Sequence, residues 1–361
     1  MSSSGSVWIL EWVIAAGAAA CLALLLLAVA LRAGASLLAR WRRRAEQLVR
    51  PLVLEAVMGR GVPEEAVAAR GRRGRAVERV AFSYLARVRG EGHDLLADLL
   101  QRRGVTGRLI GRSGWPSRHR RAAAASQLGL LGTVAAERQL EALASADPSP
   151  QVRIVAARGL GKTGEPAAAD TLLSLPPAGV PAGVVASALL ELGHEATPAL
   201  RDVVADPSVP GAQRAMAADV LGLLDELTAY PELAGCLASP DPQLRSSAAS
   251  ALGRLGLPQA AGALLGCLGE GEDPGVRAAA ARALGQLGDP RAVPALAACL
   301  AEPDYWLAHH AAAALALLGP PGQRALASAA AGDQPGSRHA GEALTLARAR
   351  DQARPAAGRL R

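Results

Sequence analysis

Apolar residues recur at helical spacing in a string that returns about every 31 residues along most of the chain. Clear copies read QVRIVAARGLG from Gln151, QLRSSAASALGRLG from Gln243 and GVRAAAARALGQLG from Gly275. A shorter apolar stretch with an initial proline precedes such strings, as in PRAVPAL from Pro290. One pair of helices buries too little apolar surface to be stable alone, so the copies are expected to stack. The pattern therefore predicts an all-α solenoid of about seven to eight helix hairpins over residues 117–350.

The long strings are bounded by residues that begin helices and by recurring glycines. The dipeptide Asp-Pro precedes four of them, with the aspartates at Asp147, Asp206, Asp241 and Asp273. An aspartate accepts hydrogen bonds from the free amides of a first helical turn, and proline fits there because it has no amide proton. We therefore expect these aspartates to cap the second helix of each hairpin. The recurring glycines are expected to end these helices or to pack them closely: Gly161, Gly222, Gly253 and Gly285.

An arginine holds the same position in four of the strings: Arg153, Arg214, Arg245 and Arg277. The string Asp-Pro-x-Val-Arg-x-x-Ala-Ala-x-x-Leu-Gly, which runs from Asp273 to Gly285, resembles HEAT repeats, especially the short bacterial kind called phycobilisome-lyase-like. The resemblance covers residues 117–350 and implies a right-handed superhelix whose second helices line the concave face. It also implies that the recurring arginines bond to loop aspartates, in a ladder interrupted where Ala182 and Ala308 replace arginine.

Residues 12–31 form an uninterrupted apolar run, WVIAAGAAACLALLLLAVAL, without a charged side chain. A helix of this length spans the hydrocarbon core of a bilayer, since each residue adds about 1.5 Å. Arginines follow the run and none precedes it, so the positive-inside rule predicts an extracytoplasmic tail at residues 1–11 and a cytoplasmic solenoid at the plasma membrane. A cleaved signal peptide, a lipoprotein signal ending at Cys21 and a buried core helix are the alternatives, and the charge pattern disfavours each.

Residues 32–116 differ from the repeats in charge and in pattern. Residues 32–121 carry 21 arginines against 8 acidic side chains, whereas residues 122–337 carry 12 basic against 21 acidic ones. We interpret residues 32–116 as a basic juxtamembrane helical connector that caps the solenoid, and residues 351–361 as a basic C-terminal tail. The basic flank either contacts anionic lipid headgroups or only sets the topology and solvates its helices, and the sequence leaves both open.

Composition and charge exclude several classes of protein. Alanine is abundant while aromatic residues make up 2% of the chain, which argues against β-sandwiches, barrels and large α/β cores. The net charge of +7 first suggests nucleic-acid binding, but the acidic repeats lack the basic groove that a nucleic acid requires. The acidic array instead predicts a protein partner with a basic surface and no nucleic-acid partner.

The sequence contains no motif typical of catalysis or metal binding. His194-Glu195 is a single pair that the other repeats do not reproduce, while His309 and His310 are adjacent and so point about 100° apart on a helix. The cysteines of the array are expected to be small buried side chains at equivalent repeat positions: Cys236, Cys267 and Cys299. We therefore expect a protein that is not an enzyme and has no metal, no cofactor and no small-molecule substrate.

Two groups of residues are candidates for partner binding. Tyr305 and Trp306 begin a second helix in an array otherwise poor in aromatic side chains, and aromatic residues are enriched at interface hot spots. Polar side chains off the apolar stripe of their helices are candidates to line the concave face: Arg158, Arg254, Arg282 and Gln286. The alternatives are local packing for the aromatic pair and ordinary solvation for the polar residues.

These observations together predict a membrane-anchored HEAT-repeat scaffold or adaptor that binds a protein partner at the cytoplasmic face of the membrane. Anchoring would raise the local concentration of a weakly bound partner. One alternative is an enzyme or chaperone similar to phycobilin lyases. The other is a nucleic-acid-binding HEAT protein, against which the acidic array argues.

Overall fold

The computed structural model describes residues 39–333 and 335–357, together with Trp12 and a few positions between 24 and 32. The chain divides into two compact units, Met1–Leu109 and Ile110–Arg361. Every regular element in the described residues is a helix, which confirms the all-α fold class. Most of the predicted membrane-spanning run, residues 12–31, lies outside the described residues. In the part of the chain that is described, no helix combines the length and the apolar character needed to cross a bilayer.

The first unit is a small helical body. Residues 39–57 form its first described helix, followed by α2 (Glu64–Ala68), α3 (Gly71–Leu85) and α4 (Glu91–Arg102). Helix α5 (Val105–Ser113) begins in this unit and ends in the second. Arg103 holds the end of α2 in place, because one of its Nη atoms donates to three carbonyl oxygens there at 2.7–2.9 Å. The buried apolar side chains of this unit include Val49, Val53, Val77, Leu85, Leu96 and Leu100.

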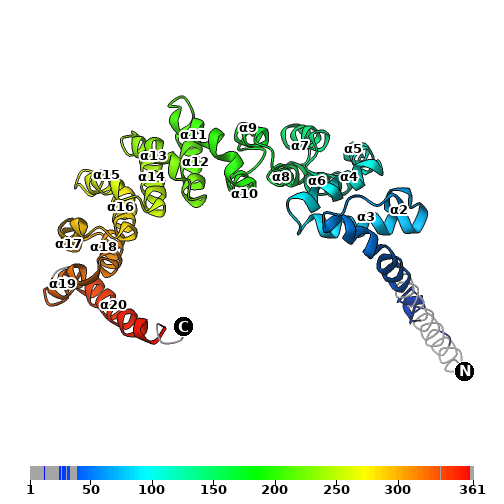
Figure 1. Ribbon diagram of the computed structural model, residues 1–361. Helices are drawn as coiled ribbons and strands as arrows, with labels where there is room; N and C mark the ends of the chain where they lie inside the picture. The colour runs from blue at the N-terminus through cyan, green and yellow to red at the C-terminus, as the bar shows by residue number, and fades with distance from the viewer. Residues whose placement is uncertain are drawn as a thin grey trace, which may run out of the picture. The chain divides into compact units, whose positions relative to one another are not determined.

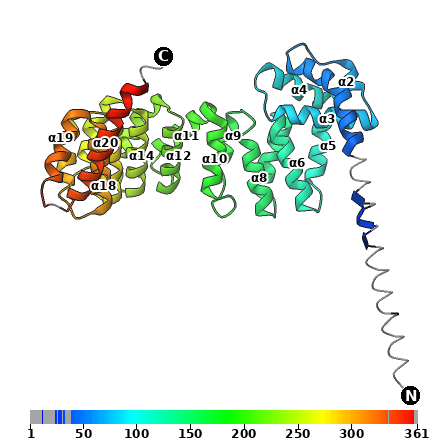
Figure 2. The ribbon, with the colours of Figure 1, turned by 90° about the horizontal axis from the view of Figure 1, so that it is seen from below.

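The second unit is an array in which two rows of helices alternate along the chain. Figure 1 shows the even-numbered helices on the inner side of its curve and the odd-numbered ones on the outer side, and Figure 2 looks onto the inner row. The inner helices are α6 (Arg118–Leu131), α8 (Pro150–Leu160), α10 (Ala182–Leu192), α12 (Gly211–Leu223), α14 (Pro242–Leu255), α16 (Pro274–Leu287), α18 (Tyr305–Leu317) and α20 (Ser337–Ala357). This alternation confirms the predicted solenoid of helix hairpins.

Five of the seven outer helices are shorter than any inner helix. They are α7 (Val134–Ala146), α9 (Ala167–Ser174), α11 (Thr197–Ala205), α13 (Tyr230–Cys236), α15 (Ala261–Gly266), α17 (Val293–Cys299) and α19 (Gly319–Ala330). Four of them follow a short 3-10 turn: η1 (Gly193–Ala196), η2 (Leu227–Ala229), η3 (Pro258–Ala260) and η4 (Pro290–Ala292). The inner row therefore corresponds to the second helices of the predicted hairpins.

Aspartates cap the inner helices in the C-terminal half of the array. Asp241 and Asp273 each accept a hydrogen bond from the backbone amide two residues later, at 2.9 and 2.8 Å. Asp304 caps α18 by accepting a 2.8 Å hydrogen bond from the amide three residues later, although no proline follows it. These contacts satisfy amides that a helix start leaves unpaired.

Asp147 and Asp206 do not cap an inner helix, contrary to the expectation from the Asp-Pro pattern. Each accepts a 2.8 Å hydrogen bond from the amide of a serine two residues later, which closes a turn ahead of the helix. Helix α8 begins at Pro150 and α12 at Gly211. A second proline follows each Asp-Pro pair, and the residue before a proline is disfavoured in helical conformation. The helix therefore starts only at or after the second proline.

Glycine and alanine bring neighbouring inner helices close together. A Cβ atom on Gly222, Gly253 or Gly285 would lie 2.6–2.7 Å from the Cα atom of an alanine on the next inner helix. Those alanines are Ala251, Ala283 and Ala314. The recurring glycines thus permit close packing, while α14 and α16 end a few residues later at left-handed glycines. This repeated contact requires small residues at these positions of the inner helices.

Candidate functional site

The repeat arginines tie successive loops of the array together. The Nη atoms of Arg277 pair with both carboxylate oxygens of Glu302, and its Nε donates to the carbonyl oxygen of Leu268 at 3.1 Å. Arg245 likewise donates to Glu272 at 2.5 and 3.1 Å and to a carbonyl oxygen at 2.6 Å. Each arginine therefore joins the loop before its own helix to the loop after the next outer helix.

The hydrogen-bond partners of the repeat arginine change along the array. Arg121 pairs with Asp147 at 2.7 and 2.9 Å. Burial opposes ionisation of Asp147, but the hydrogen bonds from Arg121 and a backbone amide outweigh it and lower the pKa of this carboxyl. Arg153 and Arg214 donate to backbone carbonyl oxygens instead of a carboxylate, at 2.6 and 2.8 Å.

The arginine–aspartate ladder that the resemblance implied therefore needs correction. Its acidic partner is an aspartate only at Asp147 and a glutamate at two other repeats. No ion pair of the described residues joins a repeat arginine to Asp206, Asp241 or Asp273, because these carboxylates face helix starts and turns. The paired arginines use their donors within the protein, so they are structural ties and not a binding surface.

Two of the predicted partner-binding residues meet in one open hollow on the inner row. The hollow has a volume of about 380 Å³ and is lined by Gly222, Leu223, Asp225, Gly253, Arg254, Gly256 and Gln286. The guanidinium of Arg254 lies 3.6 Å from a carboxylate oxygen of Asp219, which also accepts a 2.9 Å hydrogen bond from Ser247. Polar side chains of α12, α14 and α16 thus lie close together at this hollow.

The other two polar candidates lie outside this hollow. Arg282 of α16 donates a 2.7 Å hydrogen bond to the hydroxyl of Ser250 on α14, so it links two inner helices. Arg158 is exposed on α8, two inner helices before α12. The structure therefore brings Arg254 and Gln286 together and leaves Arg158 apart from them.

Tyr305 and Trp306 form the centre of an exposed aromatic cluster at the start of α18. Their side chains are among the most exposed large apolar ones of the array, at 59% and 64%, and their ring centroids lie 5.3 Å apart at 88°. His309 stacks against Tyr305 one turn later, and His339 of α20 meets the Tyr305 ring edge-on at 4.7 Å. The cluster combines residues from two inner helices.

Sequence reasoning identified the aromatic pair but not His339. A small cavity of about 120 Å³ opens between α18 and α20 and is lined by His309, Ala312, Ala313, Ala316, His339, Glu342, Ala343 and Leu346. The Nδ1 atom of His339 is buried there without a hydrogen-bond partner among the described residues. The only signal in the sequence was the predicted continuation of the hairpins to residue 350, which is consistent with α20 beside α18 but does not indicate this side chain.

Chemistry at the remaining candidate groups is limited. His194 lies 3.3 Å from Glu226 of the next repeat, not beside its sequence neighbour Glu195, and is largely exposed. Burial raises the pKa of the thiols, which confirms their expected buried positions: Cys236, Cys267 and Cys299. Within the described residues, no group of three or more histidine, cysteine or acidic side chains is arranged to hold a metal ion.

The chain is similar to a known repeat family and to several solved structures. The sequence pattern of HEAT repeats matches residues 115–189, 197–280, 232–317 and 267–347, which together make up more than half of the chain. No curated protein matches the sequence. Similar solved structures include human deoxyhypusine hydroxylase, with 21% identity over 76% of this chain and 97% of that chain, at a TM-score of 0.31.

Two further solved structures resemble this chain at similarly low identity. The Escherichia coli protein YibA shares 19% identity over 66% of this chain and 91% of its own, at a TM-score of 0.41. The CpcE–CpcF phycocyanin lyase complex from Nostoc sp. PCC7120 shares 22% identity over 67% and 94%, at 0.31. These likenesses concern the fold and establish no enzymatic activity. The repeats themselves are decisive: this chain belongs to the family of HEAT-repeat proteins.

Proposed function

We propose that this protein is a membrane-anchored HEAT-repeat scaffold whose inner helices bind a protein partner with a basic surface. The exposed aromatic pair of Tyr305 and Trp306 carries the proposal. Soluble proteins seldom leave neighbouring large aromatic side chains open to water, and such residues dominate the energy of protein interfaces. HEAT arrays offer an extended inner surface of this kind to their partners.

The charge of the array supports a basic partner. Residues 122–337 carry 21 acidic against 12 basic side chains. This stretch of the array therefore has a net negative charge, which attracts a basic surface and repels an anionic one. Screening by salt should weaken such a complex.

Membrane anchoring is proposed from the apolar run at residues 12–31 and the arginines that follow it. The described large side chains within the run are 55–66% exposed between Leu24 and Leu31: Leu24, Leu25, Leu27, Val29 and Leu31. Exposing these groups to water is costly, whereas the bilayer interior accommodates them. The proposed orientation places the N-terminus outside and the array in the cytoplasm. A C-terminal reporter that is active only in the cytoplasm should be active, and an inactive reporter would contradict this topology.

The partner proposal is tested with the full chain in intact membranes. A photoactivatable residue replaces Trp306 or, as a control, Leu227, which is 54% exposed but leads into the outer helix α13. We expect a discrete crosslinked species from position 306 and none from position 227. Equal crosslinking from both positions, or none from position 306, would contradict a binding surface at the aromatic cluster.

The captured partner then provides a quantitative test. Trp306→Ala should weaken binding by about tenfold or more, because it removes a large aromatic contact, whereas Leu227→Ala should leave the affinity unchanged. Raising the salt concentration should weaken binding to the wild-type chain as well. A partner that binds both variants equally, or that is unaffected by salt, would refute the proposed aromatic and electrostatic recognition.

A further inference from the structure

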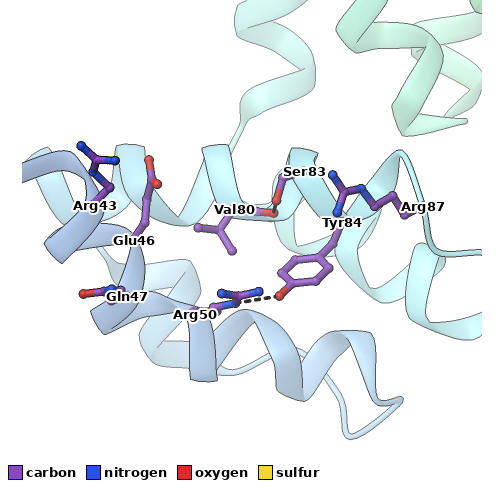
Figure 3. Close-up of a pocket in the computed structure, with 8 residues that line it drawn as sticks. All are labelled: Arg43, Glu46, Gln47, Arg50, Val80, Ser83, Tyr84 and Arg87. Atoms are coloured by element: carbon purple, nitrogen blue, oxygen red, sulfur yellow. Dashed lines mark hydrogen bonds between the residues drawn. The ribbon is translucent and has the colours of Figure 1, made fainter. Parts of the chain in front are cut away.

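A second candidate site lies in the first unit, between the helix of residues 39–57 and α3. The two helices enclose a hollow of about 340 Å³, which Figure 3 shows in close-up. Its lining side chains are Arg43, Glu46, Gln47, Arg50, Val80, Ser83, Tyr84 and Arg87. Three of these eight residues carry a full positive charge, and Val80 supplies an apolar floor that is 8% exposed.

The negative charge in the hollow is already engaged. Glu46 is the only acidic lining residue, and its carboxylate accepts a 2.8 Å hydrogen bond from Nε of Arg79. No ion pair of the described residues joins Arg43, Arg50 or Arg87 to a carboxylate. The hollow therefore has an excess of positive charge that no described carboxylate of this unit neutralises.

Hydrogen bonds hold some side chains of the hollow in place, and other donor groups there remain available to a ligand. Nε of Arg50 donates to the hydroxyl oxygen of Tyr84 at 2.9 Å, so this guanidinium reaches across from the first helix to α3, as Figure 3 shows. The Tyr84 hydroxyl accepts that bond, so its own proton remains available to a ligand. Ser83 is different, because its hydroxyl already donates to the carbonyl oxygen of Val80 at 2.7 Å. The Nη atoms of Arg50 and the amide of Gln47 add further donors.

We propose that this hollow binds a phosphate group. A phosphate offers several acceptor oxygens and a charge near −2, which match guanidinium groups better than any neutral ligand does. The end of α3 contributes a partial negative charge of roughly half a unit, which three arginines outweigh. The arrangement also favours phosphate over a cation, since the one carboxylate is held by Arg79.

Two sources of phosphate fit this chemistry: an anionic lipid headgroup and a free phosphate compound. The lipid source rests on the proposed membrane anchor, whereas binding of phosphate itself does not. Testing the full chain in micelles of a neutral detergent keeps the two questions separate. The probes are inorganic phosphate, dioctanoyl phosphatidic acid and dioctanoyl phosphatidylcholine, and calorimetric titration measures their affinity.

The variants separate the hollow from charge in general. Arg43→Gln, Arg50→Gln and Arg87→Gln combined should weaken phosphate binding by at least about tenfold, since each removes charge-assisted hydrogen bonds. The matched control combines Arg42→Gln, Arg44→Gln and Arg89→Gln, which removes the same charge from exposed positions outside the hollow. This control should bind phosphate within about twofold of the wild-type chain.

Tyr84→Phe provides a milder test that retains the ring and its packing. Loss of the hydroxyl should weaken binding severalfold without changing the circular dichroism spectrum. Tighter binding of phosphatidic acid than of inorganic phosphate would identify the lipid headgroup as the source, and equal or weaker binding would identify a free phosphate compound. Absence of binding by both phosphate probes, equal losses in the two triple variants, or equal binding of phosphatidylcholine would overturn the proposal.

Discussion

The repeat arginines of the array and the arginines that line the hollow of the first unit serve different purposes. In the array, Arg245 and Arg277 are largely buried, and each bonds to a carboxylate and to a backbone carbonyl oxygen. In the first unit, Arg43, Arg50 and Arg87 are exposed around a hollow whose single carboxylate is held by another arginine. The same side chain is structural where a carboxylate pairs with it, and it is a candidate ligand-binding group where no described carboxylate does.

The difference follows from how each unit is built. The array repeats one contact set: an arginine between loops and a glycine against the alanine of the next inner helix. Repetition makes each contact part of a continuous core, so losing one weakens the interface between neighbouring repeats. The first unit has no such repeat. Arg103 is structural there as well, but the arginines that line the hollow project from helices whose cores close without them. Stability and binding should therefore respond to different substitutions in the two units.

The largest effect is expected for Arg277→Met in the array. This change leaves the Glu302 carboxylate and the Leu268 carbonyl oxygen without their donor, which should lower the free energy of unfolding by about 3 kcal/mol. Urea denaturation followed by circular dichroism measures it. Arg254→Met is the matched control, because Arg254 is exposed and should change stability by less than about 0.5 kcal/mol. Equal losses in both variants would show that the ties do not hold the array.

Gly253→Ala should have the next largest effect. Its Cβ would lie 2.7 Å from the Cα of Ala283, so α14 and α16 must separate, at a cost of about 2 kcal/mol. The control is Gly262→Ala in the outer helix α15, where a Cβ meets nothing within 4 Å. That change should stabilise the helix by about 0.5–1 kcal/mol. Thermal unfolding of both variants checks the opposite signs, and a shared sign would refute close packing at the inner row.

Glu137 of α7 differs from the paired acids of the array, because no arginine of the described residues forms an ion pair with this buried carboxylate. It is 7% exposed, one carboxylate oxygen lacks a hydrogen-bond partner, and burial together with nearby Glu141 and Glu165 raises its pKa above the ordinary 4.5. Because the pKa of Glu137 is raised in the folded protein, its ionisation disfavours folding, and this cost grows as the pH rises above 4.5. Glu137→Gln should therefore stabilise the protein at pH 7 by about 1 kcal/mol.

The paired acid Asp147 provides the opposite pH dependence. Its pKa is lowered below 3.8 despite burial, so its contribution is present at neutral pH and is lost as the pH falls through the lowered pKa. Unfolding measured from pH 3 to pH 8 should show the gain of Glu137→Gln shrinking toward acid pH. The loss caused by Asp147→Asn should shrink in the same direction. A gain for Glu137→Gln that does not depend on pH would contradict a buried ionised carboxylate.

The smallest effect on stability is expected in the hollow of the first unit. Replacing Arg43, Arg50 and Arg87 together by glutamine should change the free energy of unfolding by less than about 0.5 kcal/mol, because these groups are exposed and form no ion pair. Chemical denaturation of the full chain checks this. A loss as large as that of Arg277→Met would mean that these arginines are structural after all.

Periodicity predicted the array well because the same pattern of residues occurs in successive repeats. The inner helices, the close-packing glycines and the buried cysteines all follow from positions that recur about every 31 residues. Prediction was weaker where a repeat varies. Asp147 and Asp206 precede a second proline, which moves the helix start, and the acidic partner of the repeat arginine changes from aspartate to glutamate. Such local changes alter hydrogen bonding without altering the apolar pattern.

Contacts between side chains that are far apart in the sequence could not be predicted from the sequence. Tyr305 and Trp306 were identified from their type alone, while His339 joins them only because α20 packs beside α18. The hollow in the first unit was invisible for the same reason. Arg43 and Arg50 stood out only as part of a general excess of arginine, and pairing of two helices sets Arg50 opposite Tyr84. Charge composition indicates an anion-binding region, but only tertiary packing gathers the donors.

Arg245 and Arg277 of the array are paired with carboxylates, whereas no ion pair of the described residues engages Arg43, Arg50 or Arg87. Nitrogen-15 NMR of the arginine Nε–H groups, recorded on the full chain in neutral micelles during a titration with inorganic phosphate, tests this most directly. The account predicts that the resonances of Arg50 and Arg87 shift with phosphate while those of Arg245 and Arg277 stay fixed and exchange slowly with water. Shifts of similar size in all four resonances, or shifts confined to Arg245 and Arg277, would contradict it.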